Sequence, residues 1–262
     1  NLFTEEHAAL TGARDVIIEE TLDPEESYNI NINYLKKLYL KNGMLFTFDT
    51  SAWYTYFTNA IIPDYDTKPN QIIYDNLDGY STSTGISFNI DAIFGSGISA
   101  SIGGTYQDVS QTENGKTKKQ ILTERFSGVW SFTYKHYPTH LTLDYTGNIY
   151  GPMRLPLLGE LDPRQEYSPT WSIQNIQLTY DKFDDFEIYG GVKNLLNWTP
   201  NKGNPFIIAR ANVPYDENVQ FDSEGNVIPT ADNAYALTFD PSYVYGPNQG
   251  ARLFLGLRYK LN

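Results

Sequence analysis

Two histidines bracket a short polar segment, and a metal site would be sought there first. His136 and His140 are separated by three residues, a spacing that occurs in metal sites, but the segment between them contains Pro138 and resembles a tight turn. Residues 75–79 and 222–226 look like calcium loops, yet neither has the full set of oxygen ligands at the required spacing. Turn chemistry explains these features more simply. We therefore expect no metal site.

Residues for catalysis are also not arranged as an active site. The chain contains no nucleophile elbow, phosphate loop or dinucleotide fingerprint. The adjacent acids Asp184 and Asp185, like Glu25 and Glu26, have the setting of solvated turn charges. Cysteine is absent, which excludes thiol catalysis, disulfides and Cys-ligated clusters within this chain. The sequence predicts neither catalytic residues nor a cofactor.

Charge and hydropathy narrow the class of partners. Lys and Arg number 19 against 31 Asp and Glu, so the formal net charge is −12. This charge argues against nucleic acid as a partner, because phosphate contacts require clustered Lys and Arg. Unbroken apolar runs do not exceed four residues, as at 206–209, so no transmembrane helix is expected in these 262 residues.

The elements that must position any site are β-strands, because side-chain polarity alternates with a period of two. Residues 141–149 alternate polar positions with apolar ones, namely Leu141, Leu143, Tyr145 and Ile149. Residues 44–59 and 251–261 alternate in the same way. Successive side chains of a strand point to opposite faces, so each segment has one apolar face and one polar face.

Nine such strands can be drawn along the chain. They are expected at residues 27–39, 45–59, 80–93, 97–107, 119–134, 139–150, 168–181, 185–197 and 250–261. Most have about 11 to 16 residues, whereas strands in soluble domains usually have about 5–6. A tilted strand needs roughly 9–11 residues to cross a bilayer. The lengths therefore favour strands that span a membrane.

The connections alternate between short and long. Short turns are expected at 41–43, 95–97, 136–140 and 181–185, and long polar connections at 60–79, 108–118, 151–167 and 198–249. This alternation places every long loop at one end of the sheet, as in transmembrane β-barrels. We predict an all-β, antiparallel transmembrane β-barrel structure and a single domain over residues 1–262.

Two other protein classes stay open on these patterns. One is a passive or structural outer-membrane barrel, although the loop of about 50 residues argues against a simple pore. The other is a soluble, Tyr-rich β-sandwich that binds glycans or hydrolyses them with paired carboxylates. The frequent tyrosines (21 in the chain) also fit the aromatic girdles of a membrane barrel.

Three stretches resemble parts of the TonB-dependent outer-membrane receptors. Residues 188–197, Ile-Tyr-Gly-Gly-Val-Lys-Asn-Leu-Leu-Asn, are similar to the Gly-Val-x-Asn-Leu strand of that family. Residues 239–250 are similar to the approach to the last barrel strand, and residues 22–29 to the entry of a mid-barrel strand. The style is most similar to receptors of Bacteroidota-type bacteria. One departure is the end, Leu261-Asn262, where the family typically has an aromatic residue.

The resemblance implies a fold, a location and partners. Twenty-two strands would need roughly 640 residues, so the chain is expected to be the C-terminal nine strands of a 22-stranded barrel. The plug, the TonB box and the other strands would lie outside it. The implied function is outer-membrane uptake of a large scarce nutrient such as iron–siderophore, haem or cobalamin, energised through TonB. Outer-membrane lipid would surround the barrel, and a surface lipoprotein partner is left open.

Two groups of site residues follow, without catalytic or metal-binding members. Strand parity predicts that six charged residues face the lumen and the plug: Asp49, Arg125, Asp144, Lys193, Arg252 and Arg258. The external loops are expected to contact the ligand through Arg154, Arg164, Tyr167, Arg210, Tyr215, Tyr243 and Tyr245.

Overall fold

A computed structural model describes most of the 262-residue chain. The residues described are 15–18, 21–41, 43–64, 67, 71–155, 161, 163, 165–200, 220–224, 227–236, 245–247 and 249–259. β-strands dominate these ranges, and the helical content within them is one 3₁₀ turn, Tyr137–Thr139. Across the same ranges, no helix is both long and apolar enough to cross a membrane.

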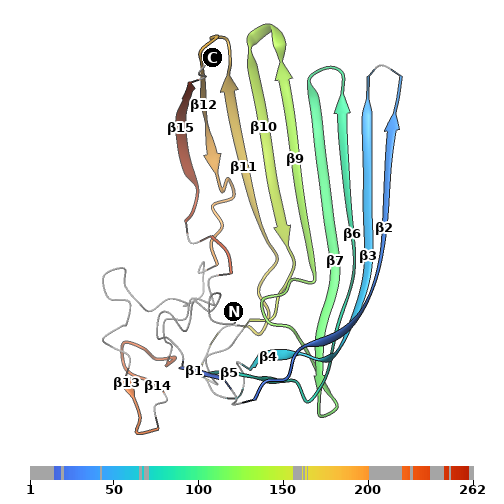
Figure 1. Ribbon diagram of the computed structural model, residues 1–262. Helices are drawn as coiled ribbons and strands as arrows, with labels where there is room; N and C mark the ends of the chain where they lie inside the picture. Colours follow the sequence, from blue (N-terminus) through green and yellow to red (C-terminus); the bar gives the residue numbers. More distant parts are fainter. Residues whose placement is uncertain are drawn as a thin grey trace.

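Nine long strands form one antiparallel sheet, in the spatial order β15-β12-β11-β10-β9-β7-β6-β3-β2. Figure 1 shows them side by side as a curved wall, with the short turns at its upper end. Their bounds are β2 Glu26–Tyr39, β3 Leu45–Asn59, β6 Gly79–Phe94, β7 Ile98–Glu113, β9 Phe126–His136, β10 Leu141–Tyr150, β11 Trp171–Tyr180, β12 Phe186–Lys193 and β15 Arg252–Tyr259. The predicted all-β antiparallel architecture and the order of the nine strands are confirmed.

One predicted connection is wrong. Residues 108–118 were expected to be a loop, but β7 continues to Glu113 and pairs with β8, Lys116–Lys119. Between them Asn114 and Gly115 both have positive φ, 50° and 73°. Two residues with positive φ form the tight turn whose twist matches that of antiparallel strands, and Asn-Gly is its preferred sequence. The segment is therefore a hairpin that extends the sheet.

The two faces of the sheet differ in chemistry, as the alternation predicts. Register places Ile90 opposite Ile102, and Ile102 opposite Trp130, on one face. We call this the apolar face; its side chains are largely uncovered, with Ile102 51% and Leu255 83% exposed. No second sheet covers this face within the described residues, in contrast to a β-sandwich, which would bury it. The opposite, polar face carries mainly Ser, Thr, Asn and Gly.

Smaller sheets lie at the end of the wall opposite the short turns (Figure 1). β1 (Asp15–Ile18), β5 (Gln71–Asn76) and β4 (Ile61–Asp64) form a three-stranded sheet in which β1 runs parallel to β5. Its core is Ile72, which is 0% exposed, and the buried Tyr74. β13 (Gln220–Phe221) and β14 (Val227–Ile228) form a separate hairpin. Strands were not expected within 60–79 or 198–249. We call this end of the wall the loop end.

Candidate functional site: the polar face and the loop end

A shallow hollow on the polar face arises because its side chains are small. Ser51, Ser87, Thr105 and Ser127 lie opposite one another in turn across β3, β6, β7 and β9. Beside this row lies Gly103, and together these residues line a hollow of about 290 Å³. The lining carries hydroxyls and few bulky groups, so the face is suited to contact with polar ligand or protein surfaces.

Side-chain hydrogen bonds, both between strands and within one strand, order the polar face. Between β9 and β10, Thr133 Oγ1 donates to Asp144 Oδ1 over 2.7 Å. Within β6, Asn89 Nδ2 donates to Asp91 Oδ2 over 2.8 Å. The predicted site residue Asp144 is therefore on the polar face and engaged by Thr133. Asp49 lies on the same face, exposed, at the rim of the hollow. Whether either residue contacts a plug stays a prediction.

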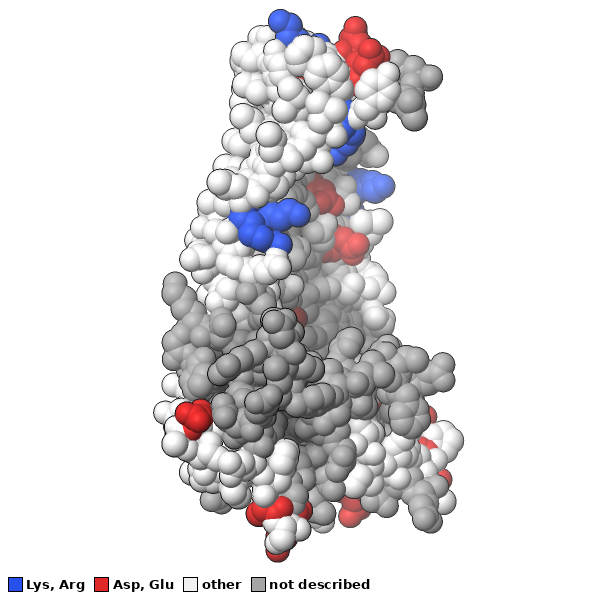
Figure 2. All heavy atoms as spheres, turned by 90° about the vertical axis from the view of Figure 1, so that its left-hand side faces the viewer, with Lys and Arg blue, Asp and Glu red and all other residues white. Residues whose placement is uncertain are grey.

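Three predicted cations lie on the polar face of β12 and β15. Arg258 Nη1 is 2.8 Å from Glu187 Oε2, and its guanidinium lies 5.4 Å from the centre of the Tyr189 ring. Lys193 and Arg252 lie directly opposite each other at the loop end of the same two strands. Figure 2 looks onto the edge of the sheet formed by β15, and blue atoms of Lys and Arg gather part-way along it.

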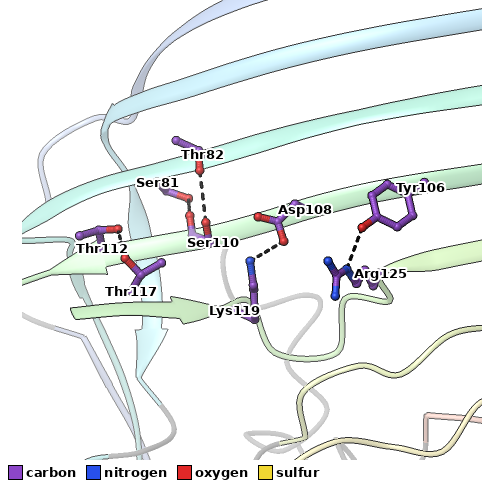
Figure 3. Close-up of polar contacts among 9 residues, drawn as sticks. All are labelled: Ser81, Thr82, Tyr106, Asp108, Ser110, Thr112, Thr117, Lys119 and Arg125. Atoms are coloured by element: carbon purple, nitrogen blue, oxygen red, sulfur yellow. Dashed lines mark hydrogen bonds and ion pairs between the residues drawn. The ribbon is translucent and has the colours of Figure 1, made fainter. Parts of the chain in front are cut away.

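Arg125 contacts a residue of the apolar face. Parity assigned it to the polar face, but its Nε donates to Tyr106 Oη over 3.0 Å, and Tyr106 belongs to the apolar face. Figure 3 shows the guanidinium directed at this hydroxyl, beside the Asp108–Lys119 ion pair. Arg125 precedes the first residue of β9, Phe126, so the alternation of a strand does not govern its side chain. The geometry thus places this guanidinium beside a residue of the apolar face, and the contact of Arg125 with the lumen stays a prediction.

Of the predicted loop residues, Arg154 and Tyr167 come together. They form an antiparallel bridge and line a hollow of about 210 Å³ together with Arg125 and Glu124. Arg154 has only 11% of its side chain exposed, and its Nε is 3.2 Å from Glu166 Oε1. Arg154 is therefore largely engaged within the protein, whereas Tyr167 is exposed. Arg164, Arg210, Tyr215 and Tyr243 lie outside the described residues.

A ladder of aromatic rings on the polar side of the loop end holds the remaining predicted residue, Tyr245. The ring centres of Tyr150 and Trp171 are 4.4 Å apart, those of Trp171 and Trp198 are 4.7 Å apart, and Tyr245 lies 6.2 Å from Trp198. Within the described residues the buried indole N–H of Trp171 has no hydrogen-bond acceptor. The sequence analysis did not identify this ladder, because its rings come from segments far apart in the chain.

Asn194 closes the base of the long connection between β12 and β15, and sequence reasoning missed this role. Its side-chain Nδ2 donates to the carbonyl oxygens of Trp198 (2.7 Å) and Gln249 (3.0 Å), while its Oδ1 accepts from the Trp198 N–H (3.1 Å). Asn197 Oδ1 accepts from the Ala251 N–H over 2.8 Å. We call these two asparagines the loop clamp. The sequence signal that could have indicated this role is the presence of Asn194 and Asn197 just after the strand. Asn tolerates positive φ, and both residues have a φ of 52°.

Solved structures with the same strand arrangement include several receptors. The pyoverdine outer membrane receptor FpvA of Pseudomonas aeruginosa PAO1 is 15% identical, with a TM-score of 0.57 over 96% of this chain and 32% of that chain. The ferric-catecholate import receptor Fiu of E. coli K12 is 13% identical, with a TM-score of 0.53 over 68% of this chain and 24% of that chain. At these identities the likeness establishes the fold, and the chain spans about a third or less of each receptor's length.

Sequence comparison identifies the family. No curated protein matches the chain. A family model, described as TonB dependent receptor-like, beta-barrel, matches residues 5–195, which is well over half of the chain. The match agrees with the partial antiparallel barrel wall and with the solved receptors. This chain therefore belongs to the family of TonB-dependent receptor-like β-barrels.

Proposed function

We propose that the chain forms part of the wall of an outer-membrane, TonB-dependent receptor that imports a large scarce nutrient, an iron–siderophore before haem or cobalamin. The observation that carries this proposal is a single antiparallel sheet with an exposed apolar face and a polar face of small residues. Lipid would cover the first face and the lumen would lie against the second. The preference for an iron–siderophore is supported by similar structures that are named as receptors for pyoverdine and for ferric catecholates.

The height of the apolar face supports its contact with lipid. On β7 the face is apolar or glycine from Ile98 to Tyr106, then carries Asp108 and Ser110 on the same parity. At 3.3 Å per residue this interval measures about 26 Å along the strand. At the usual tilt of about 40° it spans about 20 Å across the membrane. The apolar band of an outer-membrane barrel is about 25 Å tall and ends in aromatic girdles. Tyr106 would then mark the outer boundary of the bilayer, with the loop end outside the cell.

Partners follow from the two open edges of the sheet. β2 and β15 are the ends of the strand order, so each has one long-strand neighbour among the described elements. In a closed barrel every strand has two neighbours, and the missing ones would come from the rest of the receptor. We propose that the same receptor supplies a plug that contacts the polar face and a segment that binds TonB. A surface lipoprotein could cover the loop end. The receptor would be a transporter rather than an enzyme.

An uptake experiment tests the proposed function. Cells that carry or lack the receptor gene are supplied in turn with radiolabelled ferric catecholate, ferric hydroxamate, haem and cobalamin. We expect one compound to accumulate only in cells with the receptor, and only while the proton gradient that powers TonB is intact. Accumulation of none of them, together with receptor-dependent leakage of small sugars, would instead establish a passive pore.

The extent of the receptor is tested by its denatured mass in the outer membrane. An antibody against residues 251–262 would detect a band far above 29.8 kDa if plug and wall belong to one polypeptide. A membrane band at 29.8 kDa would require a separate polypeptide for the plug. A soluble band would contradict the location.

A further inference from the structure

Two positively charged residues face each other across neighbouring strands at the loop end of the polar face. Lys193 is the last residue of β12, and Arg252 is the first residue of β15. The register makes them direct cross-strand partners, and both are exposed. Like charges directly opposite each other on one face of a sheet are destabilising.

Neither cation is neutralised by an acid within the described part of the chain. Arg252 Nη1 donates to the neutral Gln249 Oε1, and Lys193 Nζ lies 5.5 Å from the centre of the Phe254 ring. The chain as a whole is strongly acidic, with 31 Asp and Glu against 19 Lys and Arg. The pair of cations without an acidic partner is therefore an exception to the overall negative charge of the chain.

Arg258 provides an internal comparison. It lies on the same face of the same strand, but its cross-strand partner is Glu187, whose carboxylate is 2.8 Å away. The two strands thus pair a cation with an acid at one end and a cation with a cation at the other. In the second arrangement a negative group shared between the two cations would offset their repulsion.

We propose that Lys193 and Arg252 form a binding site for one carboxylate or phosphate group. The remaining guanidinium N–H groups of Arg252 suit two oxygens of one anion, and the mobile ammonium of Lys193 adds a third donor. The carboxylate or phosphate belongs either to a soluble anion at the loop end or to an acidic side chain of the plug. Only the second source, the plug, rests on the proposed function.

The test uses the complete receptor, purified in detergent. Its melting temperature and its affinity for inorganic phosphate are measured at constant ionic strength, with chloride as the balancing salt. The variants are Lys193→Gln and Arg252→Gln, with Lys193→Arg to retain the charge and Arg258→Gln as the matched control on β15.

Each source of the anion has its own expected result. For a soluble anion, phosphate raises the melting temperature of the wild type, each Gln variant at the site weakens phosphate binding about 10- to 100-fold, and Arg258→Gln and Lys193→Arg do not. For an internal acid, phosphate has no effect on the wild type, but Lys193→Gln and Arg252→Gln lower the melting temperature, whereas Lys193→Arg keeps it near the wild-type value.

Two results would overturn the site. One is a melting temperature that is unchanged or higher in Lys193→Gln and Arg252→Gln, with no response of the wild type to phosphate, because the change would then only relieve repulsion. The other is phosphate binding that both variants retain, which would place the anion elsewhere. These measurements do not depend on siderophore uptake. The anion site and the proposed function can therefore be refuted independently of each other.

Discussion

Replacing Asn194 should destabilise the receptor more than replacing any exposed asparagine of the sheet. Asn194 is 3% exposed, and its side chain makes two hydrogen bonds to Trp198 near the start of the long connection and one to Gln249 near its end. Its backbone φ is 52°, a region that Gly adopts freely and Ala does not. Gly and Ala substitutions therefore separate the contribution of the side chain from that of the backbone.

The magnitude follows from these contacts. Three hydrogen bonds at about 1 kcal/mol each make Asn194→Gly about 3 kcal/mol less stable to unfolding. Asn194→Ala should lose about 1 kcal/mol more, because Ala is strained in the left-handed region. Asn194→Asp retains the acceptor for Trp198 N–H but turns a carboxylate oxygen toward two carbonyl oxygens, so it should be at least as unstable as Asn194→Gly.

The assay is equilibrium urea unfolding of the purified receptor in detergent, followed by tryptophan fluorescence. Near-ultraviolet circular dichroism reports the stacked pair Trp171 and Trp198 at the same time, and the signal of that stack should weaken in the Asn194 variants. Asn31→Ala, an exposed asparagine of β2, is the control and should change the free energy of unfolding by less than about 0.5 kcal/mol. Asn194 variants that match this control, with an intact stacking signal, would refute the clamp.

Three further changes probe the wall itself. Ile102→Lys, near the middle of the apolar interval of β7, should cost about 2–4 kcal/mol of unfolding free energy in lipid vesicles. Ser101→Lys, the adjacent position on the polar face, should cost less than about 1 kcal/mol; equal costs would contradict the assignment of faces. Gly147→Ala should cost about 1–3 kcal/mol in a urea titration. An added Cβ would lie 2.3 Å from Trp130 Cζ2, so the additional change Trp130→Leu should recover part of the loss. Asp181→Asn removes the carboxylate that lies 2.7 Å from Lys135 Nζ on β9. It should lower the free energy of unfolding by about 1 kcal/mol at low salt. Since high salt screens such pairs, melting curves in about 1 M NaCl should show a smaller difference.

The long strands were predictable because the alternation of polar and apolar residues within each one indicates its two faces. β10, for example, places Leu143 and Tyr145 on one face and Asp144 on the other, and this pattern needs no knowledge of distant residues. Antiparallel neighbours joined by short turns then follow from the chain order. The ends of the strands were less certain: the strand expected at 185–197 ends at Lys193, because Asn194 adopts positive φ.

Features that depend on contacts between distant segments were not predictable. The parallel pairing of β1 with β5 joins segments more than 50 residues apart, and no local pattern announces it. The hydrogen bond of Arg125 was not predictable, because its partner Tyr106 is on another strand and Arg125 itself precedes β9. The aromatic ladder was unpredictable for the same reason, since Trp171 is on β11 and Trp198 lies in the connection that follows β12, where Asn194 holds it.

The β7–β8 hairpin also offers a place for a probe that measures how the wall sits in a bilayer. Its tip extends beyond the wall in Figure 1, and a Cβ added at Gly115 would meet no atom within 4 Å. The chain contains no cysteine, so a Cys in place of the exposed Lys116 would be its one thiol. A dye on that thiol, quenched by labelled lipid, would report how far the hairpin stands above the bilayer. The quenching would thereby measure how deeply the wall is embedded in the bilayer.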